Sequence, residues 1–107
     1  MNSVFLVGHL GSELKCFNQG ERNEVYGVSI ATNSSYKNQA GERIDVTEWH
    51  DLVLFGKQGE FFKDKLYKGQ KVAVNGKLVY KKYLNKGGQE SRTAQINVDN
   101  LEFFNVK

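Results

Sequence analysis

Apolar and polar residues alternate over several short segments of the chain, and glycines separate these segments. In one segment Tyr26, Val28 and Ile30 occupy every other position, which is the period of a strand with one buried face. Other segments are compact apolar runs or are rich in β-branched and aromatic residues. The pattern predicts five strands, at Val4–Leu10, Val25–Thr32, Val46–Phe55, Lys71–Tyr83 and Arg92–Phe103.

The segments between these strands carry turn and helix signals. Asn33–Asp45 is polar, so we expect a long loop or a protruding hairpin there, and Asn85–Gly88 is a cluster of turn-forming residues. Gln58–Tyr67 is predicted to be a helix, because Phe62 and Leu66 lie four residues apart on one helical face. One short helix is therefore expected between the third and fourth strands.

This order of elements is that of a five-stranded Greek-key barrel of the oligonucleotide-binding (OB) type. An SH3-like barrel or a small sandwich fits the pattern less well. The chain has no proline, and its 107 residues suffice for one modest core but not for two. We therefore predict an all-β OB-fold barrel, with residues 1–107 forming a single domain.

The composition indicates the cellular compartment of the protein. No apolar run approaches the roughly 20 residues that cross a bilayer, so no membrane association is expected. Residues 1–10 lack the basic region and cleavage site of a secretory signal. The single cysteine, Cys16, cannot form an internal disulfide, which fits a reducing compartment. A cytoplasmic protein is the expectation.

Positive charge is concentrated in one part of the chain. Residues 57–92 hold ten lysines and arginines against three acids, whereas the whole chain has a net charge of only +3. A basic region of this kind suits a polyanion such as nucleic acid. On charge alone, a lysine-rich solvated surface is the more common explanation, so the placement of the aromatic residues has to decide.

The predicted third strand carries two different faces, because side chains alternate. One face holds Trp49, Asp51, Val53 and Phe55. The other holds His50, Leu52 and Leu54, and its two leucines are the better core candidates. Trp49 and Phe55 would lie roughly 20 Å apart along the strand, a span that serves separate bases. A lone tryptophan beside apolar residues is more often part of a core, and that alternative stays open here.

Aromatic residues also lie in phase with lysines elsewhere. In the predicted fourth strand Tyr83 shares a face with three lysines, and this face is opposite the apolar stripe. The lysines are Lys71, Lys77 and Lys81. Tyr36 beside Lys37 repeats the pairing in the polar segment. Exposed rings that stack on bases, with cations that follow the phosphates, are what sequence-tolerant binding of single strands requires.

The remaining aromatic and polar residues indicate packing rather than catalysis. We assign five aromatics to packing or to a subunit contact: Phe61, Phe62, Tyr67, Phe103 and Phe104. His9 and His50 are the only histidines, and no spacing of histidine, cysteine and acids suggests a metal site. Cys16 has no local partner that would mark it as a nucleophile. We expect no enzymatic activity, no metal and no cofactor.

Five segments form a distinctive set: Val4–Gly11, Ser29–Asn33, Thr47–Lys57, Lys68–Leu78 and Tyr83–Gly88. The most specific of them is the third, TEWHDLVLFGK. In order and spacing these segments resemble the bacterial single-stranded DNA-binding protein family. The resemblance runs over essentially the whole chain and implies an OB barrel that assembles as a homotetramer.

The resemblance also implies roles for individual residues. Bases would stack on Tyr36, Trp49, Phe55 and Tyr83, and the two tyrosines stand where the family has tryptophan. Phosphate-contacting cations would be Lys37, Lys57, Lys68, Lys81 and Lys82, beside the Lys71 and Lys77 of the fourth strand. His50 matches a histidine associated with the subunit interface.

Three features depart from the family pattern. Asp51 occupies a usually basic position between Trp49 and Phe55, where an acid should repel phosphate. Val79 likewise replaces a basic residue. The sequence ends at Lys107 without the acidic tip that recruits repair and replication enzymes in the family, so such partners are not expected. We expect either a trimmed chain or a short plasmid, phage or accessory relative.

The combined expectation is a protein that binds single-stranded DNA without sequence preference and protects it during replication, recombination and repair. Its partners would be single-stranded DNA and copies of itself, as a homotetramer or a dimer, in a bacterial nucleoid or on a plasmid or phage. The alternative is a primosomal accessory protein that uses the same barrel as a protein-docking dimer. Asp51 and the absent tip favour this alternative slightly.

Overall fold

The computed structural model describes residues 1–17 and 24–104. Within these residues it contains six strands and one helix. They are β1 (Val4–Leu10), β2 (Lys15–Cys16), β3 (Val25–Lys37), β4 (Arg43–Phe55), α1 (Gly56–Phe62), β5 (Lys71–Leu84) and β6 (Glu90–Phe103). No helix of the described residues is long and apolar enough to cross a membrane.

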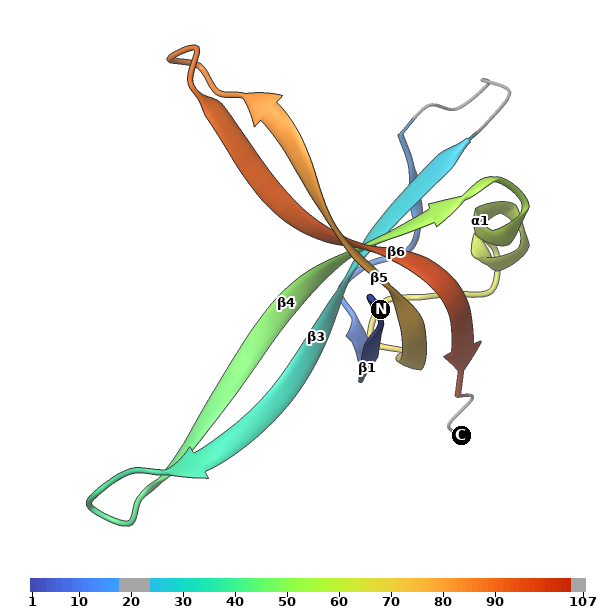
Figure 1. The fold of residues 1–107 in the computed structure, drawn as a ribbon. Helices are drawn as coiled ribbons and strands as arrows, with labels where there is room; N and C mark the ends of the chain where they lie inside the picture. The colour runs from blue at the N-terminus through green and yellow to red at the C-terminus, as the bar shows by residue number, and fades with distance from the viewer. Residues whose placement is uncertain (18–23, 105–107) are drawn as a thin grey trace.

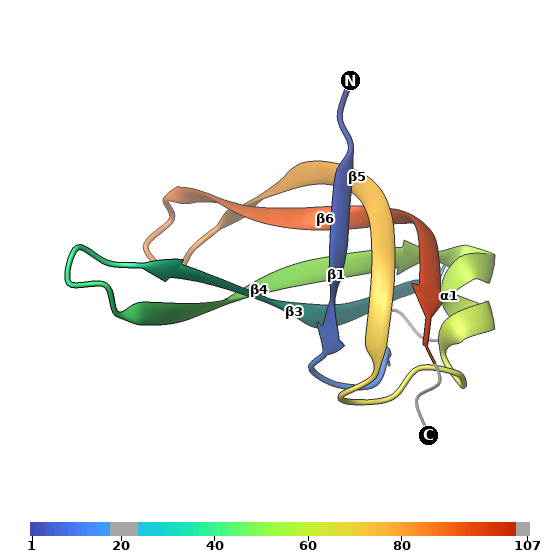
Figure 2. The same cartoon turned by 90° about the horizontal axis from the view of Figure 1, so that it is seen from below.

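Five of the strands close into a barrel (Figures 1 and 2). The hydrogen-bonded order is β1-β5-β6-β4-β3, and the end of β1 pairs with β3 to complete the ring. The short β2 extends the edge of β3. The contact between β4 and β6 is parallel and the other pairings are antiparallel. This is the predicted all-β barrel, with α1 between its third and fourth strands.

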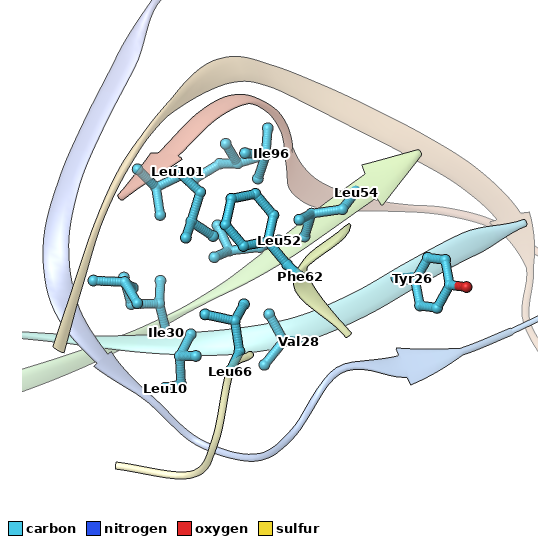
Figure 3. Packing of buried hydrophobic residues seen from close by; sticks show 13 residues of the cluster. Leu10, Tyr26, Val28, Ile30, Leu52, Leu54, Phe62, Leu66, Ile96 and Leu101 are labelled. Atoms are coloured by element: carbon cyan, nitrogen blue, oxygen red, sulfur yellow. The ribbon is translucent and has the colours of Figure 1, made fainter. Parts of the chain in front are cut away.

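The inward residues of the strands meet in one apolar core, shown in Figure 3. Val28 and Ile30 from β3 pair with Leu52 and His50 of β4, so alternate residues of both strands share the inner face. Ten members of the core are labelled there: Leu10, Tyr26, Val28, Ile30, Leu52, Leu54, Phe62, Leu66, Ile96 and Leu101. Burial, with the nearby Glu24 carboxylate as the second cause, raises the pKa of Tyr26 above its ordinary value.

A bulge in β6 keeps this strand in phase with the curved barrel. Asn75 of β5 pairs with Asn100, whereas the next residue, Gly76, pairs with Val98, so Asp99 is the extra residue. The bulge shifts the inward phase of β6 by one position, and for this reason Leu101 is buried together with Val98. A strand without the bulge would turn Leu101 outward.

Beyond the barrel, β3–β4 and β5–β6 continue as two hairpin arms that diverge from each other in Figure 1. The polar segment expected to be a loop or a hairpin is therefore a hairpin. Asn38 and Asn85 build the two turns in the same way: each side-chain Oδ1 accepts hydrogen bonds from backbone N–H groups two and four residues later. Gly41 and Gly88 then take positive φ angles, which favour glycine.

The predicted helix Gln58–Tyr67 is wrong in its limits, since α1 spans Gly56–Phe62. The chain leaves the helix early because Gly69 and Gln70 form backbone hydrogen bonds with Leu10 at the end of β1. Leu66 is nevertheless buried, as the sequence spacing had indicated.

The five aromatics assigned to packing or to a subunit contact divide into two groups. Phe62 is buried, and Phe103 is half-buried against it with the ring centroids 6.2 Å apart. Phe61, Tyr67 and Phe104 are exposed on the chain and lie outside its core, although the Phe61 ring packs edge-on against Phe62 with the centroids 4.9 Å apart. A subunit contact for them stays a prediction.

We predict that Gly59→Ala destabilises the barrel, because a Cβ at this position would collide with the ring of the buried Tyr26. Overpacking of this kind costs about 1–3 kcal/mol of the free energy of unfolding, measured by urea denaturation. Gly87→Ala is the matched control, since its Cβ would meet only Asn85 Oδ1 at 3.5 Å. Equal unfolding midpoints for the two variants would contradict the prediction.

Candidate nucleic-acid interface

A groove of about 700 Å³ lies over the outward face of β3 and β4. Its floor is formed by two cross-strand pairs, Gly27 with Val53 and Ser29 with Asp51. The residues that alternate with them along each strand point into the core. Gln95 of β6 also lines the groove. The groove is thus the outer side of the same sheet that carries Leu52 and Leu54 on its inner side.

Two phenylalanine rings line the groove. Phe55 ends the outward row of β4, and Phe17 follows β2. The ring of Phe17 lies directly on Gly27, where any Cβ would collide with it, yet Phe17 remains 70% exposed. Glycine at this outward position therefore allows an aromatic ring to lie close against the strand without being buried.

Trp49 lies further along the same outward row of β4. Its ring covers Gly11, where a Cβ would come within 2.7 Å of the ring atom Cζ3. The side chain is 61% exposed, so the alternative of a core tryptophan is wrong. The predicted row of Trp49, Asp51, Val53 and Phe55 faces outward. Three of these residues are exposed, and Val53 is half-buried.

The other two predicted stacking residues lie on the arms. Tyr83 pairs with Ser91 and belongs to the same alternating set of β5 as Lys77 and Lys81. Tyr36 pairs with Ile44, which puts it in the alternating set of β3 that faces inward within the barrel. All four predicted rings are exposed, but Tyr36 does not share the strand face of Trp49.

The predicted lysines divide by position. Lys81 lines the groove, and Lys77 lies on the same face of β5. Lys82 is on the opposite face and forms an exposed ion pair with Glu90, with 3.5 Å between Nζ and Oε1. Lys37 lies at the last paired position of the β3–β4 arm.

Three further lysines do not line the groove. Lys57 lies in α1, Lys68 follows it, and Lys71 opens β5 with its Nζ 5.8 Å from the ring centroid of Phe104. In Figure 2, α1 lies at the end of the barrel opposite the tips of the two arms. Phosphate contacts by these lysines stay a prediction that the groove itself does not support.

Asp51 and His50 are adjacent but face opposite ways. Asp51 is exposed in the groove, where its Oδ1 accepts a hydrogen bond of 3.3 Å from the Ser29 hydroxyl. His50 is half-buried, and its Nε2 lies 2.9 Å from Thr32 Oγ1. A role for His50 in a subunit interface remains a prediction. Among residues 1–17 and 24–104, no cluster of three or more His, Cys, Asp or Glu side chains is arranged to hold a metal ion.

Comparison with known proteins identifies the family. The model of the single-strand binding protein family matches residues 1–104. The chain belongs to this family. Its members are DNA-binding proteins without enzymatic activity, so the chain is a single-stranded DNA-binding protein and not an enzyme.

Two solved structures of the family share the fold. The SSB of Plasmodium falciparum in complex with ssDNA is 26% identical, with a TM-score of 0.86, over 98% of this chain and 96% of that chain. A deletion mutant of the Thermus aquaticus single-stranded DNA-binding protein is 24% identical, with a TM-score of 0.84. It is matched over 98% of this chain and 51% of that chain.

Sequence reasoning missed several groove residues of this single-strand binding family member. Phe17 lies outside every alternating apolar run, so no periodicity singles it out. Ser29 and Gln95 are polar residues at outward strand positions, where the pattern does not distinguish a groove from plain surface. Gly27 was the available signal, since a glycine inside a strand marks the close approach of another group.

We predict that Phe17→Ala weakens binding of single-stranded oligo-dT, because the groove loses one of its two rings. Loss of one base–aromatic stack lowers affinity about 5- to 150-fold in a fluorescence titration. Phe61→Ala removes an exposed ring of α1 outside the groove and should leave affinity unchanged. An unchanged affinity for Phe17→Ala, with folding intact, would exclude a stacking role for this ring.

Proposed function

We propose that the protein coats exposed single-stranded DNA without requiring a particular sequence, and protects it during replication, recombination and repair. The observation that supports this most strongly is that Trp49 and Phe55 are exposed on the outward row of β4, next to the groove that Lys81 lines. Any base has a face that can stack on such rings, and a lysine beside them can contact the phosphates.

The mechanism that we propose is passive. Each stacked base contributes about 1–3 kcal/mol, and each lysine at a phosphate releases condensed counterions. Trp49 and Phe55 are six positions apart on β4 and would therefore hold different bases. Tyr83 extends the proposed contact along the β5–β6 arm, and Tyr36 offers a further exposed ring on the β3–β4 arm, on the face opposite to Trp49.

Duplex DNA and duplex RNA fit this surface less well than a single strand does. Bases inside a paired helix are stacked on one another and offer no free face to Trp49 or Phe55. A gel shift with single- and double-stranded oligonucleotides of equal length separates the two, and tighter binding of the duplex would contradict the proposal.

We predict that poly-dT quenches the fluorescence of Trp49, the single tryptophan of the chain, in a strongly salt-dependent way. Lys81→Ala should flatten the plot of log affinity against log salt by about 0.7, the contribution of one phosphate on a single strand. The absence of both quenching and salt dependence would exclude strand coating through this face.

The charge-matched control for Lys81→Ala is Lys63→Ala. Lys63 is an exposed lysine at the end of α1 and does not line the groove. Both variants lose one positive charge, so a general effect of net charge would flatten the two salt plots equally. A flattening confined to Lys81→Ala would identify a local phosphate contact.

Asp51 supports a second candidate function, a protein-docking module. A carboxylate in the groove lowers the affinity for phosphate and favours a partner that offers hydrogen-bond donors instead. We predict a homotetramer for the coating function and a dimer for docking, distinguished by analytical ultracentrifugation. For the coating role we propose a cytoplasmic setting.

A further inference from the structure

Asp51 is an acid in the middle of a groove that we propose to hold a polyanion. It lies two residues from Trp49 and four from Phe55 in sequence and shares their outward face. A carboxylate close to a phosphate is repulsive, since both are anionic. The bases of the bound strand, however, carry hydrogen-bond donors that a carboxylate can accept.

The carboxylate of Asp51 is available to a ligand. Lys81 lines the same groove, yet no ion pair within 4.0 Å joins it to Asp51 in the described part of the chain. The one hydrogen bond to the Asp51 carboxylate found there comes from the Ser29 hydroxyl and reaches Oδ1. A carboxylate has about four acceptor sites, so most of them remain open toward the groove.

Gln95 adds a second acceptor to the same groove. Its amide Nε2 donates to Asn97 Oδ1 at 2.9 Å, which orients the side chain and leaves the carbonyl Oε1 as its other polar atom. Asp51 and Gln95 both line the smaller hollow between β4 and β6 as well, so they are neighbours on this surface. Asp51 and Gln95 therefore place two acceptors in the groove, beside the donors of Lys81 and Ser29.

The two pyrimidines differ in how they meet such acceptors. Cytosine carries an N4 amino group that donates hydrogen bonds, whereas thymine has the O4 acceptor at the same place. Phe17 lies on Gly27, two residues from the Ser29 that pairs with Asp51, so a base stacked on this ring turns its edge toward the acceptors. The two N–H groups of cytosine N4 match the two acceptors, Asp51 and Gln95, whereas thymine offers one donor, N3–H, flanked by two carbonyl oxygens that acceptors repel.

We propose that Asp51, assisted by Gln95, gives the groove a preference for cytosine over thymine at the base that lies against it. This inference rests on the proposed single-strand binding. Stacking keeps the protein tolerant of any sequence, and Asp51 adds discrimination at one position. One such contact corresponds to about a fivefold difference in affinity.

The test compares oligo-dC with oligo-dT of equal length in mildly alkaline buffer containing a chelator, with Trp49 fluorescence as the readout. In a homopolymer the base against Asp51 is always the same, so the register of binding does not matter. We expect the unmodified chain to bind oligo-dC about five times more tightly than oligo-dT. Asp51→Asn should bind both oligonucleotides more tightly and reduce their ratio to about one.

Asp64→Asn is the matched control, since it removes one exposed carboxylate near α1, outside the groove, and should keep the preference for cytosine. Equal binding of the two oligonucleotides by the unmodified chain would overturn the inference and leave single-strand binding intact. A preference that persists in Asp51→Asn, or that appears only when magnesium replaces the chelator, would overturn it as well. Failure to bind either oligonucleotide would instead overturn the proposed function.

Discussion

The alternation of side chains along β3 and β4 is the constraint on which the rest of the structure depends. Leu52 and Leu54 are fully buried in the barrel core, and their burial fixes which way every other residue of β4 points. A slip of one residue would exchange the two faces of the strand. The hydrophobic core therefore holds Trp49 and Phe55 open to solvent, although neither residue contributes to the core cluster.

Glycines make this outward face suitable for rings. An aromatic side chain on a sheet usually packs against the side chain beside it, but Gly11 and Gly27 offer only backbone to Trp49 and Phe17. Each ring thus contacts a glycine on one side and remains largely exposed. A ring that is already oriented loses less conformational entropy when a base stacks on it, so part of the cost of binding is met during folding.

The sequence allowed the barrel and the outward row of β4 to be predicted because both follow from local periodicity. Features that depend on distant contacts were not predictable in this way. The helix ends early because of hydrogen bonds to Leu10, which lies far away along the chain. The strand face on which Tyr36 lies follows from its pairing with Ile44 in the β3–β4 arm. The sequence predicted this segment only as a loop or a hairpin, so this face was not predictable. Phe17 belongs to the groove through its contact with Gly27, which no pattern near Phe17 reveals.

Asp51 shows why sign of charge alone is a poor guide to this surface. As a charge, it opposes the lysines and weakens the nearby phosphate contacts, whatever the sequence of the strand. Considered as a hydrogen-bond acceptor beside Gln95, it acts on base edges, and its effect depends on which base is present. The first effect is screened by salt, whereas the second is short-ranged and persists as salt rises. Discrimination between bases should therefore become a larger share of the binding free energy at high salt, where the phosphate contacts of Lys81 and its neighbours are weakest.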